Sequence, residues 1–178
     1  MVPEPAPAWR KLREAWFFLW HLGETESKQP TPEEFDYFLS AFLSAARSVV
    51  YKVYFWSGER WKIVDDWKAT RTADDLKFFD SMTGLRDAEV HNEGITTIRE
   101  QEAAPMRPSF DERYSTRFAA LLAAGMLGET TVYIDRHYIN LEADRVKAVP
   151  ACKRFAALVE DLLRYVDALI AKGDTSPR

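Results

Sequence analysis

The spacing of hydrophobic residues along most of the chain is that of amphipathic helices. Apolar residues recur at intervals of three and four over 8–22, and Gly23 follows as the expected stop. A second run with the same period extends over 32–56. Its apolar members are Phe35, Phe38, Leu39, Phe42, Leu43, Ala46, Val49, Val50 and Val53. We therefore predict two consecutive helices, 8–22 and 32–56.

Two threonines have the sequence context of helix N-caps. Thr31 is followed by a proline and stands three residues before Glu34, which is the pattern of a capping box. Thr72 stands three residues before Asp75, and apolar residues at helical spacing continue from there toward His91. These caps predict that helices begin directly after residues 31 and 72.

Two further helices follow from the same kind of pattern. Gly58 ends the second helix, and Trp61, Val64 and Trp67 predict a short helix across the connection. A last helix opens at Pro150 and is closed by Gly173. Its inward positions are Phe155, Leu158, Val159, Leu162, Leu163, Val166, Leu169 and Ile170.

The stretch between these helices is less regular. Glycine and prolines interrupt 92–111, so we predict a loop there, and the alanine-rich 113–127 can form a helix. Residues 131–141 alternate and are rich in β-branched and aromatic side chains, which favours a small hairpin with Asp135-Arg136 at its turn. For 118–141 as a whole, both helix and strand remain open.

These elements define the expected fold class. It is all-α, an up-and-down bundle of four to five main helices with a minor β-hairpin before the last helix. We expect one helical domain over 8–172. The ends, 1–7 and 173–178, are rich in proline or polar residues and are predicted to be disordered.

Composition and net charge limit the classes of protein to which the chain can belong. The chain has 178 residues, 47% of them hydrophobic, and a net charge of −4, which indicates one soluble globular domain that does not coat nucleic acid by bulk charge. The longest uncharged run, 118–128, is too short to span a bilayer, so no membrane contact is expected. The single cysteine, Cys152, permits no intrachain disulfide and favours a cytoplasmic location. It lies on an apolar helical face, where we interpret it as a small buried hydrophobe.

Few residues have the spacing of a catalytic or metal site. The three histidines, His21, His91 and His137, are too far apart for a local metal motif, and no cofactor motif is present, so we expect neither metal nor cofactor. The acidic pair Asp74-Asp75 falls in the first turn of a helix, where carboxylates stabilise the helix dipole.

One short segment combines charged groups with a histidine at a helix end. Arg86, four intervening residues and His91, with Asp87 directly after the arginine, resemble the R-x(4-6)-H motif of the HEPN superfamily of small helical bundles. In its catalytic members this resemblance implies metal-independent cleavage of RNA. His91 would act as general base or acid, Arg86 would neutralise charge on the phosphorane, and Asp87 would position or polarise both.

The resemblance also implies partners. In the family, two protomers bring their motifs together across a two-fold axis, so we expect a homodimer with a composite cleft and an RNA substrate. Members of toxin or defence type also have an antitoxin or regulatory protein partner. The position two residues after the histidine, often a tyrosine in the toxin branch, is Glu93 here.

A non-catalytic interpretation remains open. Between Asp80 and Glu102, six acidic residues against two arginines leave a local charge of −4, which would repel an RNA backbone unless other segments offset it. In the alternative, Arg86 pairs with nearby carboxylates and His91 caps the helix. The chain would then be a HEPN-like binding or regulatory module that acts through protein partners.

Overall fold

The computed structural model of the chain describes residues 6–28, 31–56, 62–91, 97–105, 131–142 and 144–172. At 27–28, 32, 56, 86–91, 104–105 and 131–134 it describes the backbone alone. Within these ranges the molecule is mostly helical, with one small antiparallel sheet. The predicted helical class is therefore right, whereas the predicted strand content is too small.

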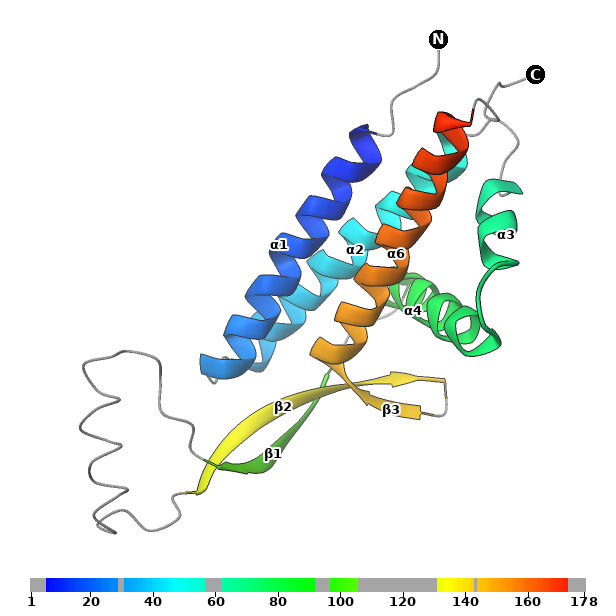
Figure 1. The fold of residues 1–178 in the computed structure, drawn as a ribbon. Helices are drawn as coiled ribbons and strands as arrows, with labels where there is room; N and C mark the ends of the chain where they lie inside the picture. Colours follow the sequence, from blue (N-terminus) through cyan, green and yellow to red (C-terminus); the bar gives the residue numbers. More distant parts are fainter. Residues whose placement is uncertain are drawn as a thin grey trace, which may run out of the picture.

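Three long helices lie side by side along their lengths (Figure 1). They are α1 (Ala6–Lys28), α2 (Pro32–Trp56) and α6 (Ala148–Ala171), and α1 runs in the opposite direction to the other two. The short helix α3 (Lys62–Lys68) leads into α4 (Ala73–His91), which crosses the long helices and contacts both α2 and α6. Helix α2 has the bounds that the sequence predicts.

The sheet lies at the end of the long helices where α1 finishes and α6 begins (Figure 1). Its order is β1-β2-β3, with β2 (Thr131–Leu141) in the centre and β1 (Ile98–Pro105) and β3 (Asp144–Lys147) at the edges. Both pairings are antiparallel. In the described part of the chain, β2 is the only strand that has a strand on each side.

One apolar core joins the long helices to α3 and α4. Its largest fully buried side chains are Trp67, Phe35, Phe42, Phe79, Phe155, Leu22, Leu39, Leu43, Met82, Ile139, Leu162 and Leu163. Cys152 is also fully buried, and burial raises the pKa of its thiol, which confirms the interpretation of this residue as a small hydrophobe. The helical spacing of these residues is what makes each helix turn one apolar face to the centre.

Two tryptophans form hydrogen bonds with α6 at the edge of the core. The indole Nε1 of Trp9 donates to Asp167 at 3.1 Å, and the indole Nε1 of Trp67 donates to Asp161 at 2.7 Å. Arg71 adds an ion pair with Asp161 at 2.8 Å. The last helix is thus bound to both the first helix and the α3 region.

Helix α1 differs from the prediction at its C-terminal end. Gly23 does not stop it, and the helix continues to Lys28 because Thr25 and Glu26 are buried against the rest of the fold. Glu26 also accepts a hydrogen bond from Arg136 of β2 at 2.8 Å. This burial offsets the cost of about 1 kcal/mol that glycine imposes inside a helix.

The prediction of a loop over 92–111 is wrong at β1. The strand ends at Pro105, so the proline terminates the element instead of interrupting it. An edge strand with exposed residues at 99–101 has no alternating apolar pattern, which is why periodicity misses it.

The hairpin predicted within 131–141 is also wrong, because β2 runs straight through Asp135 and Arg136. Asp135 lies within the strand and not at a turn, because it is buried and pairs with Arg99 of the neighbouring strand β1. The chain turns later, where Glu142 adopts φ 55° and leads into β3. Such a left-handed residue suits the tight connection of a two-stranded ribbon.

The remaining differences concern ends of elements. Helix α6 begins at Ala148, and Pro150 occupies its first turn, where the missing N–H costs no helical hydrogen bond. The predicted helix over 113–127, the terminating residues Gly58 and Gly173, and Trp61 lie outside the described residues.

Candidate functional site

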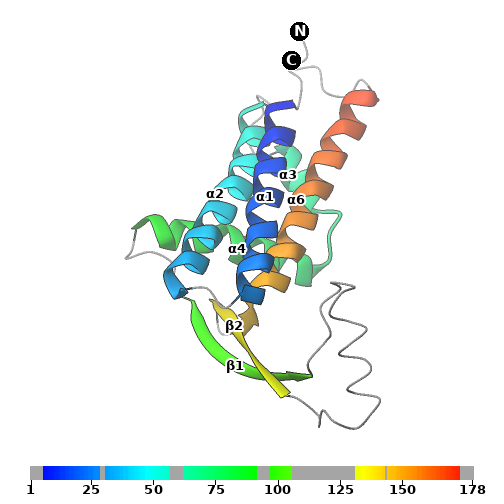
Figure 2. The same cartoon turned by 90° about the vertical axis from the view of Figure 1, so that its left-hand side faces the viewer.

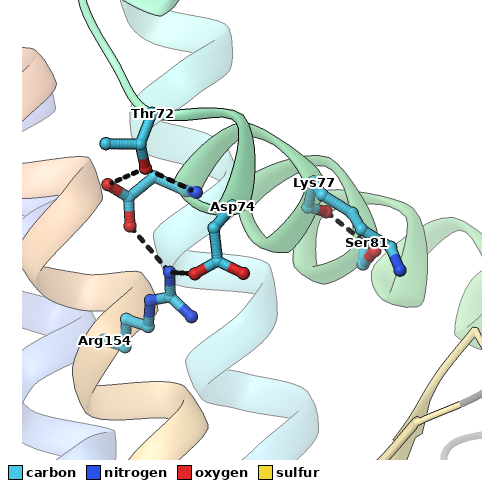
Figure 3. Close-up of polar contacts among 6 residues, drawn as sticks. Thr72, Asp74, Lys77, Ser81 and Arg154 are labelled. Atoms are coloured by element: carbon cyan, nitrogen blue, oxygen red, sulfur yellow. Dashed lines mark hydrogen bonds and ion pairs between the residues drawn. The ribbon is translucent and has the colours of Figure 1, made fainter.

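Helix α4 carries the candidate motif, and its first turn is held by a predicted cap. The Thr72 hydroxyl accepts from the Asp75 backbone N–H at 3.1 Å and donates to the Asp75 carboxylate at 2.8 Å. Arg154 of α6 bridges Asp74 and Asp75, the latter at 2.7 Å (Figure 3). The hydrogen bond from Arg154, with that from Thr72, lowers the pKa of Asp75. The capping role predicted for the acidic pair is confirmed.

The middle of α4 is tied to the sheet and to the core. The Ser81 hydroxyl hydrogen-bonds to the Lys77 carbonyl at 2.8 Å (Figure 3) and to the Glu142 carboxylate at 3.0 Å. Lys77 forms an ion pair with Glu142 at 3.3 Å. On the opposite side of the helix, Phe79 and Met82 are buried. These contacts fix the direction in which the last turns of α4 extend.

Arg86, Asp87 and His91 lie in those last turns. The backbone is helical through His91, whereas the side chains of all three residues lie outside the described part of the structure. Figure 2 shows that α4 passes behind α2 and that its last turns emerge on the side of α2 away from α6. On a continuous helix, positions 86 and 91 are about 140° apart around the axis. One copy of the chain therefore does not present both positions on one helical face.

Six residues after His91, the chain is held again by a small polar cluster. The Thr97 hydroxyl donates to Asp36 of α2 at 2.7 Å, and the Thr97 backbone N–H donates to the same oxygen at 3.3 Å. Nδ1 of His137, on β2, lies 2.9 Å from the Thr97 hydroxyl. Thr97, directly before β1, is thus attached to both α2 and the central strand.

The protonation of His137 follows from this geometry. Because Thr97 gives its single hydroxyl proton to Asp36, the His137 Nδ1–H must be the donor to Thr97. The ring is fully buried and stacks on Phe35 with centroids 3.8 Å apart. Burial lowers the pKa of His137, so the ring is neutral near pH 7, and its Nε2 has no hydrogen-bond partner among the described residues.

A second buried polar contact lies beside this cluster. Asp135, two residues from His137 on the same strand, forms an ion pair with Arg99. The Arg99 guanidinium lowers the pKa of Asp135 and is itself held charged by the contact. The sequence did not point to this cluster, since Asp36 of α2, Thr97 and His137 of β2 are far apart in the chain and share no motif.

The acidic charge around the motif is partly balanced by described cations. Asp80 pairs with Lys68 at 2.6 Å, and Glu100 pairs with Arg145 at 2.5 Å. Glu102 pairs with Lys147 at 2.7 Å, and this contact, with the Tyr138 hydroxyl, lowers the pKa of Glu102. Three of the six acids between residues 80 and 102 thus have cationic partners, which weakens their repulsion of a phosphate backbone.

Two further sequence expectations bear on the chemistry. In the described ranges, no three or more His, Cys, Asp and Glu side chains are grouped so that they could hold a metal ion. Of the helices in the same part of the chain, none is both long and apolar enough to cross a membrane.

Comparison with known proteins leaves the family unassigned. No protein-family model, no curated protein and no solved structure matches the chain.

Proposed function

We propose that the chain is a HEPN-like endoribonuclease that cleaves RNA without a metal ion. Its working unit is a homodimer in which the motifs of two copies, Arg86, Asp87 and His91, line one cleft. The lengthwise packing of α1, α2 and α6 supports the corresponding up-and-down bundle. The buried, unpaired thiol of Cys152 fits a reducing, cytoplasmic setting.

The observation that carries the proposal is the way in which contacts with the rest of the fold hold α4. This helix is unbroken to His91, and the chain is held on both sides of the motif, by the Thr72 cap and Arg154 before it and by Thr97 after it. A helix that is anchored to the rest of the fold is suited to catalysis, because its reacting groups can be in position before the substrate binds.

The proposed reaction needs only these side chains and the RNA. The 2′-oxygen attacks the adjacent phosphorus, the bond from phosphorus to the 5′-oxygen breaks, and a 2′,3′-cyclic phosphate and a 5′-hydroxyl are formed. His91 accepts the 2′ proton, and the partner's His91 donates a proton to the leaving oxygen. Arg86 stabilises the charge on the phosphorane, and Asp87 orients the arginine and the imidazole. The 140° between positions 86 and 91 supports a site shared by two copies.

The test is cleavage of a mixed pool of structured and single-stranded RNA in EDTA. His91→Ala and Arg86→Ala should each lower the rate by about 100-fold or more, with cyclic-phosphate ends on the products of the wild type. Arg164→Ala is the matched control, since Arg164 lies on α6 with an exposed side chain and pairs only with Glu160 among the described residues. No cutting by the wild type, or equal cutting by all four folded proteins, would refute the proposal.

A binding or regulatory module is the second candidate. It is favoured by the aromatic side chains that α1 exposes, Phe17 at 55% and Trp20 at 60%. Exposed aromatic clusters of this kind are typical of protein interfaces. In this function the motif is structural, and an antitoxin or regulatory protein partner binds the exposed surface.

A further inference from the structure

The outer face of α1 carries a regular stripe of large side chains. Arg10, Arg13, Phe17, Trp20 and Glu24 are separated by three and four residues in turn, which is a heptad spacing. On a helix these five positions fall within an arc of about 80°. We call this stripe the α1 seam.

The fold does not use the α1 seam for its own core. The opposite face of the helix supplies Leu12, Ala15, Leu19 and Leu22, each at most 3% exposed. Arg10 and Arg13 are exposed, whereas Glu24 is half-buried and also has a contact within its own chain. Figure 2 shows α1 in front of α2 and α6, with no other described element over its outer side.

The order of charges along the α1 seam is complementary to the same order in a second copy that runs in the opposite direction. It runs from two arginines through two aromatic residues to a glutamate. If two copies meet in antiparallel fashion about Phe17, residues equally far from position 17 face each other. Arg10 then faces the partner's Glu24, and Arg13 lies near the partner's Trp20, where a guanidinium can stack on an indole.

We propose that the α1 seam is an isologous interface between two copies of this chain, with the two-fold axis at Phe17. Isologous contacts are the commonest in protein oligomers, and their centres are enriched in tryptophan and arginine. A parallel pairing would set Arg10 against Arg10 and Glu24 against Glu24. An RNA strand or an anionic membrane suits the two arginines, but it is repelled by the glutamate at the other end.

This interface is independent of the proposed nuclease. The last turns of α4 lie on the far side of α2 from α6, whereas α1 lies in front of both α2 and α6 (Figure 2). Contact through the seam therefore leaves the Arg86 to His91 segment uncovered. If the motifs of two copies also meet, the assembly is larger than a dimer.

The first test measures mass by light scattering during size exclusion, at several protein concentrations. Phe17→Glu should halve the mass of the wild-type assembly, and Trp20→Glu should raise its dissociation constant by more than roughly tenfold. Phe55→Glu is the matched control, because Phe55 on α2 is 75% exposed and lies off the seam. Circular dichroism of each variant verifies that α1 remains folded. A monomeric wild type, or a mass unchanged by Phe17→Glu, would overturn the proposal.

A charge exchange tests the antiparallel order itself. Arg10→Glu alone should weaken association, since it sets a second carboxylate against the partner's Glu24. Adding Glu24→Arg in the same chain should restore association by recreating the pair with opposite signs. Restoration by the double variant supports the interface, whereas a further loss would overturn it. RNA cleavage is read in parallel, and its failure with intact self-association would refute the nuclease alone.

Discussion

The helical layer and the sheet of this molecule are held together by different forces. In the helical layer, aromatic rings such as Phe42, Phe79 and Phe155 are fully or almost fully buried and contact one another. In the sheet, the described side-chain contacts of β1 with the other strands are mainly ionic, as in the pair of Arg99 with Asp135. Apolar burial changes little with pH, whereas ion pairs depend on protonation and salt. The two layers should therefore respond differently to the same perturbation.

The largest effect is expected from the helical layer. Phe155→Ala removes a ring that is 0% exposed and contacts both Phe42 and Phe79, so the free energy of unfolding should fall by about 3–5 kcal/mol. Urea denaturation followed by circular dichroism measures the loss. Phe55→Ala, at a ring that is 75% exposed, should cost far less, and equal losses for the two variants would contradict a buried core at this position.

An intermediate effect is expected where the two layers meet, at His137. Its pKa is lowered by burial, so the unfolded chain takes up a proton near pH 6.5 before the folded chain does. The free energy of unfolding should thus fall as pH decreases from 7 toward 5, and His137→Gln should reduce this slope. Asp36, Arg99 and Asp135 are the charged groups that act on the ring.

The loss of stability that His137 causes between pH 7 and 5 can be distinguished from the loss that the carboxylates of the sheet cause at lower pH. The lowered pKa of Asp135 gives stability that is present above its ordinary value near 4 and is lost as pH falls further. Chemical denaturation at a series of pH values should show this lower window in both proteins. An unchanged slope between pH 5 and 7 in His137→Gln would exclude His137 as its source.

The smallest effect is expected at exposed helix ends, outside both the apolar core and the sheet. Thr72→Ala removes the cap of α4 and should cost about 1 kcal/mol of unfolding free energy. Thr31→Ala, which removes the corresponding contact at the start of α2, should cost a similar amount. Thermal unfolding of the two variants gives the comparison, and a Thr72→Ala protein as stable as the wild type would show that the cap adds nothing to the other contacts of α4.

The helices were predictable from the sequence because their signals are local. Helix α2 matches its predicted bounds, since both the Thr31 cap and the apolar period lie within the segment itself. Helix α1 was predicted too short at its C-terminal end. The burial that extends it past Gly23 depends on contacts such as that of Glu26 with Arg136, 110 residues away.

The strands and the polar cluster were not predictable in the same way. Strand β1 is held by pairing with residues 26 to 40 positions later, and its exposed side chains have no strand period. Asp36, Thr97 and His137 form a cluster only after α2, the start of β1 and β2 have come together. The placement of the motif at the end of α4 did follow from the Thr72 cap and the helical period.

The contacts that fasten α6 affect the order in which the chain can fold. Helices α1 and α2 are neighbours in sequence and can pair early, with only a short loop to close. Trp9 finds its acceptor 158 residues later, in the last helix. During synthesis, the apolar face shared by α1 and α2 therefore stays open until α6 has left the ribosome. Any factor that binds this face before then acts on a half-formed core, at a stage when the nascent chain is most prone to aggregate.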